Sequence, residues 1–391
     1  MINISHERNK YMKELVRKNK KLIIKIFISV IFVAGITVFA KYDCFLYKEP
    51  IGKIIEVNTE CIDEGQGDLE ERYLQTMLVE IQNGRYKGHI FTYYNKFLYS
   101  EFNTTSYKKG TEVFLSIKEE IDSSGESIND DGITIKFMNT KTDYYLVFII
   151  SIFVVLVLFI SKIKGIWIIL SVVVNIAVFE AGLHGFIDGR HVGILTILLT
   201  VLFVVFTMLF INGLSKKTFG AIVSSLVTVA IIYLIYIITY HFSKKPMFEL
   251  MDYIIGDEPL EKLYLTSIIF GALGAVMDVC VTINSSVSEI AATAEKPTIK
   301  TMIKSVREIS YDIMGTMINV LFFTFISGGL PMFILRIKNG YSLNEILNLN
   351  IVFDEMRFLI GAIGIVMAIP VSGFFAILIN RKYLGNGEME K

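Results

Sequence analysis

The sequence predicts an α-helical polytopic membrane protein with about eight transmembrane helices and a small β-barrel domain, OB-like in type, between helices 1 and 2. Two observations predict the helices: 53% of the 391 residues are hydrophobic, with a mean hydropathy of +0.55, and long apolar runs recur along the chain. A third observation predicts the β domain, because the polar segment 41–142 contains short alternating runs separated by turn residues.

The apolar runs are compared with the length needed to cross the hydrocarbon core of a bilayer, which is about 20 residues. Runs of suitable length lie at 22–40, 144–161, 165–187, 192–211, 218–241, 263–283, 311–335 and 358–380. The stretch 165–211 is divided because one helix of that length is too long for a single span. These runs predict eight helices in contact with the lipid bilayer.

Basic residues set the expected orientation, because the cytoplasmic loops of membrane proteins are rich in Lys and Arg. The N-terminal segment is strongly basic, and so are the short loops that eight spans place on the same side. We therefore expect both termini in the cytoplasm.

The chain divides into a basic N-terminus (1–21), a signal-anchor helix (22–40), an extracytoplasmic β domain (41–142), a seven-helix domain (143–380) and a cytoplasmic tail (381–391). A cleaved signal peptide is the alternative for the first helix, since Val38-Phe39-Ala40 resembles a cleavage site.

The β domain is predicted from five runs, at 51–57, 73–81, 89–94, 111–117 and 133–137. Turn residues such as Asn83-Gly84 separate them. We expect the domain to act as a gate, a lid or a docking module for a protein partner. Cys44 and Cys61 lie in or next to it, and the sequence leaves open whether they pair.

Two acidic residues are the strongest functional signal. Asp278 lies inside an apolar run, where an ionised side chain costs at least about 2.5–3.5 kcal/mol, and Asp312 opens the next run. Each begins a polar stripe at helical spacing. We expect both acids in the inner half of the membrane with their stripes facing one another, so that one carboxyl holds a proton if they lie close together. Hydrogen bonding that only joins helices is the alternative. The residues of the predicted substrate or ion pathway are Asp278, Thr282, Asn284, Asp312, Thr316 and Asn319.

Glycines and a proline indicate close packing or irregular backbone near these stripes. Gly271 and Gly274 precede Asp278 by two turns and one turn, which lets another helix approach. Gly328, Gly329 and Pro331 lie together in the seventh run, and this combination predicts a break in the helix there.

A third polar group lies near the expected outer surface. Glu180, His184 and Asp188 recur every four residues, a pattern that suits an outer gate, a proton-entry group or a divalent metal. An interfacial polar turn is the alternative. We expect no metal here.

Several segments resemble one known family when they are taken together. They are Val79-Glu-Ile-Gln-Asn-Gly-Arg-Tyr-Lys-Gly88, Gly271-Ala-Leu-Gly-Ala-Val-Met-Asp278, Asp312-Ile-Met-Gly-Thr-Met-Ile-Asn319, Gly328-Gly-Leu-Pro331 and Glu355-Met-Arg357 followed by Gly361-Ala-Ile-Gly364. This set resembles the YibE/F-like bacterial membrane proteins over most of the chain from about residue 51 onward. The resemblance implies a multispanning plasma-membrane protein and implies no substrate.

The expected function is that of a transporter or permease with an acidic inner-half site for a small solute or cation. The alternative is a membrane assembly protein that binds a partner through the β domain. An intramembrane aspartyl protease, in which two acids share a proton, is a remote alternative; otherwise we expect no enzymatic activity. The sequence has no phosphate-binding loop, so we expect no cofactor. Zero net charge gives no indication of a nucleic-acid partner.

Overall fold

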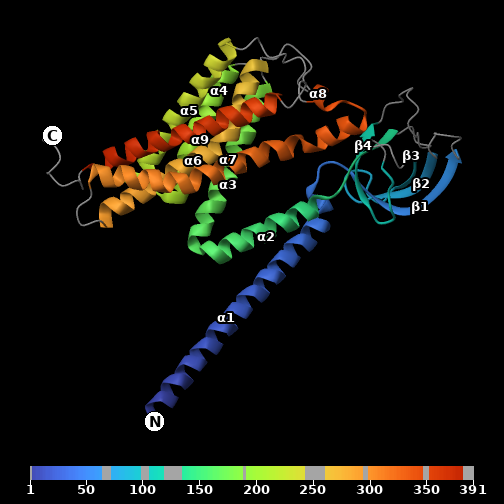
Figure 1. Cartoon of the computed structure of the whole chain (residues 1–391). Coiled ribbons are helices and arrows are strands. Elements are labelled where there is room, and N and C mark those ends of the chain that lie inside the picture. The colour runs from blue at the N-terminus through green and yellow to red at the C-terminus, as the bar shows by residue number, and fades with distance from the viewer. Residues whose placement is uncertain are drawn as a thin grey trace. The chain divides into compact units, whose positions relative to one another are not determined.

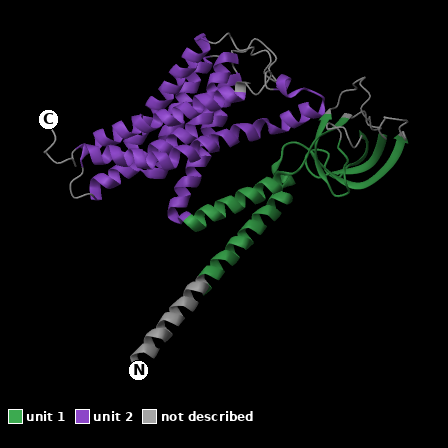
Figure 2. Cartoon of the chain, viewed as in Figure 1, with its two compact units in different colours: residues 1–160 green, residues 161–391 purple. Residues whose placement is uncertain are grey.

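The computed structural model describes residues 2–63, 72–97, 105–118, 134–187, 191–242, 260–293, 298–346 and 352–381. The chain forms two compact units, residues 1–160 and residues 161–391 (Figure 2). Eight helices among the described residues are long and apolar enough to cross a membrane, which agrees with the eight predicted spans.

The first unit contains two long helices and a sheet (Figure 1). Helix α1 is followed by the short 3-10 helix η1, five strands and helix α2. Their bounds are α1 Ile2–Lys41, η1 Cys44–Leu46, β1 Ile51–Asp63, β2 Arg72–Ile81, β3 Ile90–Phe97, β4 Glu112–Lys118, β5 Thr134–Thr140 and α2 Asp143–Ser161. All five predicted strands are therefore confirmed.

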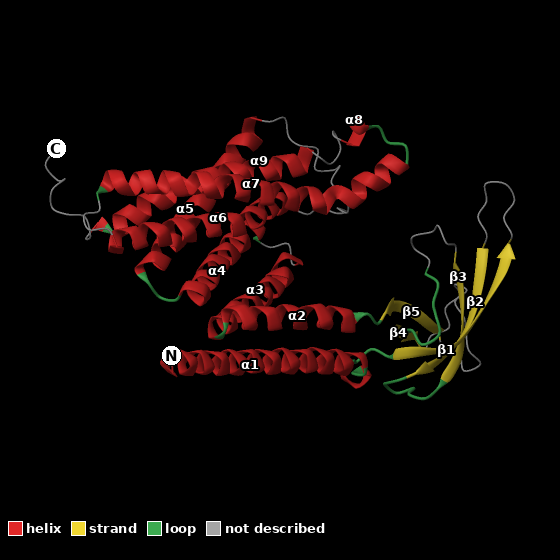
Figure 3. Cartoon of the chain, turned by 60° about the horizontal axis from the view of Figure 1, so that its bottom comes forward, coloured by secondary structure: helices red, strands yellow, loops and turns green. Residues whose placement is uncertain are grey.

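The sheet is antiparallel throughout, with strand order β3-β2-β1-β4-β5 (Figure 3). Its strands alternate apolar and polar side chains, so one face forms a core around Ile54, Met77, Val79 and Leu115, which are all buried. The sheet is a half-barrel, in agreement with the predicted OB-like type.

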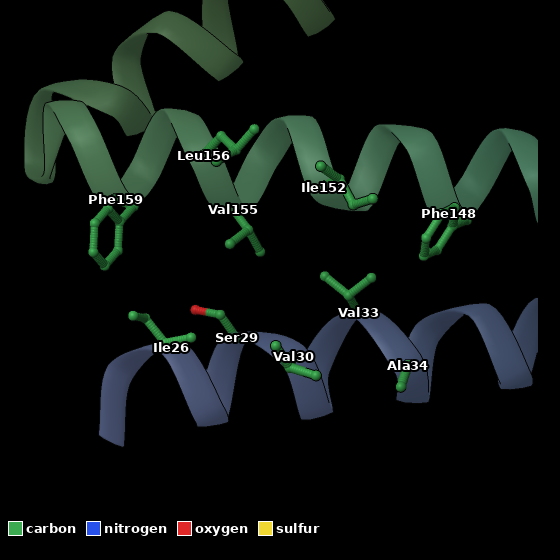
Figure 4. A pocket seen from close by; sticks show the side chains of 10 residues that line it. All are labelled: Ile26, Ser29, Val30, Val33, Ala34, Phe148, Ile152, Val155, Leu156 and Phe159. Atoms are coloured by element: carbon green, nitrogen blue, oxygen red, sulfur yellow. The ribbon is translucent and has the colours of Figure 1, made fainter. Parts of the chain in front are cut away.

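Helices α1 and α2 flank an apolar groove of about 460 Å³ (Figure 4). Val33 and Ile26 of α1 and Phe148 and Phe159 of α2 are among the side chains that line it. The hydroxyl of Ser29 is the only polar side-chain group in the lining. Because polar groups do not converge there, the lining offers apolar contacts and no set of polar groups that would bind a polar ligand.

The second unit is a helical bundle. Its helices are α3 Ile163–Ile187, α4 Val192–Asn212, α5 Lys216–Phe242, α6 Leu260–Thr293, α7 Ile299–Lys338, α8 Leu343–Ile346 and α9 Val352–Ile379. Helices α5, α6 and α9 pack against one another and supply most of the buried core, while α3 packs on α4 and α7 packs on α6 and α9.

Helices α6 and α7 are much longer than the predicted spans. At 1.5 Å per residue, the 40 residues of α7 extend about 60 Å, twice the hydrocarbon thickness of a bilayer. The sequence patterns missed these extensions because 284–293 and 299–310 are too polar to count as spans, although they continue the helices.

The predicted break in α7 is wrong. The helix continues through Gly328, Gly329 and Pro331 to Lys338. Proline removes one hydrogen bond of a helix, and in α7 the loss of that bond does not interrupt the helix.

Candidate functional site

Helix α6 has a core face and an open face. Val276, Val279 and Ile283 are fully buried, whereas Asp278 and Gly274 lie on the exposed side. A Cβ added to Gly274 would meet no atom within 4 Å. The predicted polar stripe of α6 is therefore directed away from the core of the second unit.

The carboxylate of Asp278 has no hydrogen bond or ion pair with any residue that the structure describes. The hydroxyl of Thr282 donates to the backbone carbonyl of Asp278 at 2.8 Å, so this proton is used within the helix. What remains on this face of α6 is a set of oxygen acceptors: the carboxylate of Asp278 and the lone pairs of the Thr282 hydroxyl.

Helix α7 repeats the arrangement. Asp312, Thr316 and Asn319 are all exposed. The Thr316 hydroxyl donates to the carbonyl of Ile313 at 2.8 Å, and the Asn319 amide donates to the carbonyl of Gly315 at 2.8 Å. Among the described residues, the carboxylate of Asp312 also has no hydrogen bond or ion pair. Each helix thus presents an exposed polar stripe of its own, and the two stripes, Asp278 with Thr282 on α6 and Asp312, Thr316 and Asn319 on α7, are together called the open polar face.

The contact between α6 and α7 shows how their stripes are oriented. The ring of Phe325 on α7 lies 2.7 Å from the position that a Cβ on Gly271 of α6 would occupy. Phe325 is thirteen residues after Asp312, which places it on nearly the opposite side of the helix. Helix α7 thus turns its Phe325 side toward α6, and the Asp312 stripe does not face the Asp278 stripe. The sequence predicted stripes that face one another, and periodicity alone does not fix the direction in which a stripe faces.

Asn284 departs from the other predicted pathway residues because it is buried, with 1% of its surface exposed. Its amide donates to the carbonyl of Cys280 at 2.9 Å and to the hydroxyl of Ser224 on α5 at 3.4 Å. Its side-chain oxygen lies directly against Gly220 of α5. Asn284 therefore joins α6 to α5 in the core.

A polar seam continues from Asn284 between α5, α6 and α9. The hydroxyl of Ser372 on α9 donates to the sulfur of Cys280 at 3.1 Å, and the amide of Asn380 donates to Ser288 at 3.0 Å. The seam is formed by Ser224, Cys280, Asn284, Ser288, Ser372 and Asn380. Most of these residues were not predicted, because a single hydroxyl or thiol on a core face leaves little trace in a hydropathy pattern.

Two of the segments that carry the family resemblance, one on α7 and one at the start of α9, meet at a charged contact. A Cβ added to Gly329 would lie 3.3 Å from a carboxylate oxygen of Asp354. Asp354 in turn pairs with Arg357 at 3.2 Å, and the Arg357 guanidinium lies over the ring of Tyr264 at 5.2 Å. Gly328 has open space around it. Gly329 therefore allows α7 to approach an ion pair of α9.

The outer polar group is described in part. Glu180 and His184 are exposed near the end of α3, and Asp188 lies outside the described residues. The described parts of the chain contain no group of three His, Cys, Asp or Glu residues that could hold a metal ion.

A buried lysine joins the helices of the first unit to its sheet. The ammonium of Lys141 lies 2.9 Å from Asp43, 3.1 Å from Asp143 and 2.6 Å from the carbonyl of Ala40. Burial alone would lower the pKa of Lys141, but hydrogen bonds to the two carboxylates raise it above its ordinary value. Tyr47 donates a hydrogen bond to Asp143, which raises the pKa of Tyr47 to about 12.

Asn83 closes the same junction from the β2–β3 turn. Its side-chain oxygen accepts from the backbone N–H of Ile51 at 2.6 Å, and its amide donates to the carbonyls of Cys44, Tyr47 and Glu49. No disulfide joins Cys44 to Cys61. Lys141 and Asn83 were not identified from the sequence as structural residues, although Asn83-Gly84 was recognised as a turn.

Comparison with known proteins assigns both parts of the chain. The family model described as YibE/F-like protein matches residues 149–382, and that described as YibE/F family N-terminal domain matches residues 45–131. No curated protein and no solved structure gives a significant match. The two matches cover most of the chain, and with eight apolar helices among its described residues the protein is a multi-pass membrane protein that belongs to the YibE/F-like family.

Proposed function

We propose that this protein is a transporter or permease, and that the open polar face of α6 and α7 lines the path of a small solute or cation. The observation that carries the proposal is the exposure of Asp278 and Asp312 on membrane-spanning helices, without an ionic partner among the described residues. Ionisable residues within spans usually face a protein interior or a water-filled cavity, because hydrocarbon does not solvate them.

The chemistry of this face suits a cation or a proton. The Thr282 and Thr316 hydroxyls and one N–H of the Asn319 amide donate to backbone carbonyls of their own helices. Their oxygens and the two carboxylates remain as acceptors, and oxygen acceptors are the ligands that hard cations prefer. Asn284 is the exception among the predicted pathway residues, and we assign it to helix packing.

The placement of the two acids favours transport over proteolysis. An aspartyl protease needs two carboxylates close enough to share a proton. Asp278 and Asp312 lie on stripes that do not face one another, which does not suit a dyad within this chain.

We also propose an orientation with both termini in the cytoplasm of a bacterial plasma membrane. The support is the basic N-terminus and the basic loops on the same side, as is usual for cytoplasmic segments. This orientation places the β domain on the outer side of the membrane.

Flux measurements test the proposal. The full chain is reconstituted in proteoliposomes that contain a pH-sensitive dye, and pulses of Na⁺, K⁺ or acid are applied outside. Asp278→Asn and Asp312→Asn should each abolish flux while the variants remain folded, because the amide keeps the size of the side chain and removes its charge. Full flux in both variants would eliminate the proposal.

A second candidate is a membrane assembly protein that binds a partner through the β domain. The observation in its favour is that β3 is an edge strand of the sheet, on which Ile90 and Tyr94 are exposed. It predicts that replacing residues 45–140 by a short linker abolishes activity in cells, whereas the two aspartate variants behave as the wild type.

A further inference from the structure

A groove of about 480 Å³ lies between the start of α7 and the end of α9. Ile299, Ile303 and Val306 form its α7 wall at helical spacing, and the opposite wall contains Phe374 of α9 and Arg381, which follows that helix. The two helices are antiparallel here, so the start of α7 lies next to the end of α9. The groove therefore runs from Val306 to the end where Ile299 and Arg381 lie close together.

The walls of this groove are apolar and accessible. Ile303 is 55% exposed and Phe374 is 63% exposed. Gly373 forms the floor, where a Cβ would lie 3.1 Å from Val306, so α7 and α9 are in contact beneath the groove. The α7 wall from Ile299 to Val306 is about 10 Å long, so the groove can hold part of one acyl chain.

Helical spacing places three cations of α7 beside one edge of the groove. Lys300, Lys304 and Arg307 follow the apolar stripe of α7 by one residue at the same spacing, and all three are exposed. Arg381 lies at the end of the groove. Glu308, one turn after Lys304 on α7, lies 3.8 Å from it in a highly exposed pair that contributes little.

We propose that this groove binds an anionic phospholipid, with an acyl chain along Ile303 and Phe374 and the phosphate near Arg381, Lys300 and Lys304. Charge complementarity selects this occupant: none of the described residues that line the groove is acidic, and three cations on one helix match a phosphodiester at the surface of a bilayer. The proposal is independent of transport and would stand if the flux experiment failed.

Photolabelling of the full chain in phosphatidylcholine nanodiscs tests the proposal. A trace of lipid with a photoreactive acyl chain is added, with either a phosphatidylglycerol or a phosphatidylcholine headgroup, and labelled peptides are mapped by mass spectrometry. Phosphatidylglycerol should label residues 299–306 and 370–381 preferentially. The double variant Lys300→Gln, Lys304→Gln should reduce that preference on the order of 25-fold, since each cation contributes about fivefold.

Two matched controls make the result specific. Lys216→Gln with Lys217→Gln removes two exposed cations from the start of α5 and should leave the preference unchanged. Ile303→Trp fills the groove and should remove the label, whereas Ile363→Trp, on an exposed part of α9 outside the groove, should not. Equal labelling by both headgroups, labelling that survives Ile303→Trp, or cross-linking of the groove to a second chain would overturn the proposal.

Discussion

The ammonium of Lys141 lies 2.9 Å from the carboxylate of Asp43, and this contact joins the end of α1 to the end of β5. Asp143, at the start of α2, accepts from the same ammonium. A single cation therefore connects both membrane helices of the first unit to its sheet.

Lys141→Met should destabilise the first unit by about 3 kcal/mol, because it leaves two acids without their counter-ion in a largely buried setting. Hydrogen exchange of the backbone amides of β1 and β5 should then accelerate about a hundredfold. Lys109→Met, which removes an exposed lysine, is the control. Exchange rates that match the control would show that the ion cluster does not hold the junction.

The junction around Lys141 should also lose stability at alkaline pH. The pKa of Tyr47 is raised to about 12 and that of Lys141 is raised above its ordinary value, so the folded state binds both protons more tightly than the unfolded chain. Their contribution is complete below about pH 10 and is lost as the pH rises through the folded-state pKa values. Circular dichroism between pH 7 and 12.5 should show a loss of strand signal that begins near pH 10. Tyr47→Phe should shift this loss, and an unchanged profile would contradict the assignment.

Asn83→Ala should cost about 2 kcal/mol, because it leaves the N–H of Ile51 and three carbonyls without their partner. Protease sensitivity of the segment between α1 and β1 measures the effect. Asn58→Ala, which removes an exposed side chain bonded only to Glu60, should leave the cleavage rate unchanged.

Gly220→Ala should lower the thermal midpoint in detergent, since its methyl group would collide with the side-chain oxygen of Asn284. The double variant Gly220→Ala, Asn284→Ala should be less destabilised than the sum of its single variants, because the second change removes the collision with Asn284 and leaves only that with the flexible Cδ1 of Ile379 at 2.7 Å. Gly274→Ala is the matched control, as open space surrounds that glycine. If the two shifts in thermal midpoint simply added, residues 220 and 284 would not be in contact as described.

The eight spans and five strands were predictable because both depend on periodicity and length, which single residues hardly alter. The direction in which a given face of a helix points could not be predicted in this way. Asn284 lies six residues after Asp278, so helical geometry alone separates the two by about a third of a turn, and the structure places one in the core and the other outside. Lys141 could not be recognised because two of its three partners, Asp43 and Ala40, are distant in the sequence.

The central claim is that the open polar face of α6 and α7 is in contact with water inside the membrane. The most direct measurement is labelling of single cysteines with a membrane-impermeant maleimide in intact membranes, in a variant from which Cys44 and Cys61 have been removed. Asp278→Cys, Thr316→Cys and Asn319→Cys should react at rates close to those of a surface cysteine, whereas Ile363→Cys on the apolar side of α9 should not react. Absence of reaction at all three positions of the polar face would show that it is a dry packing surface and would contradict the transport path.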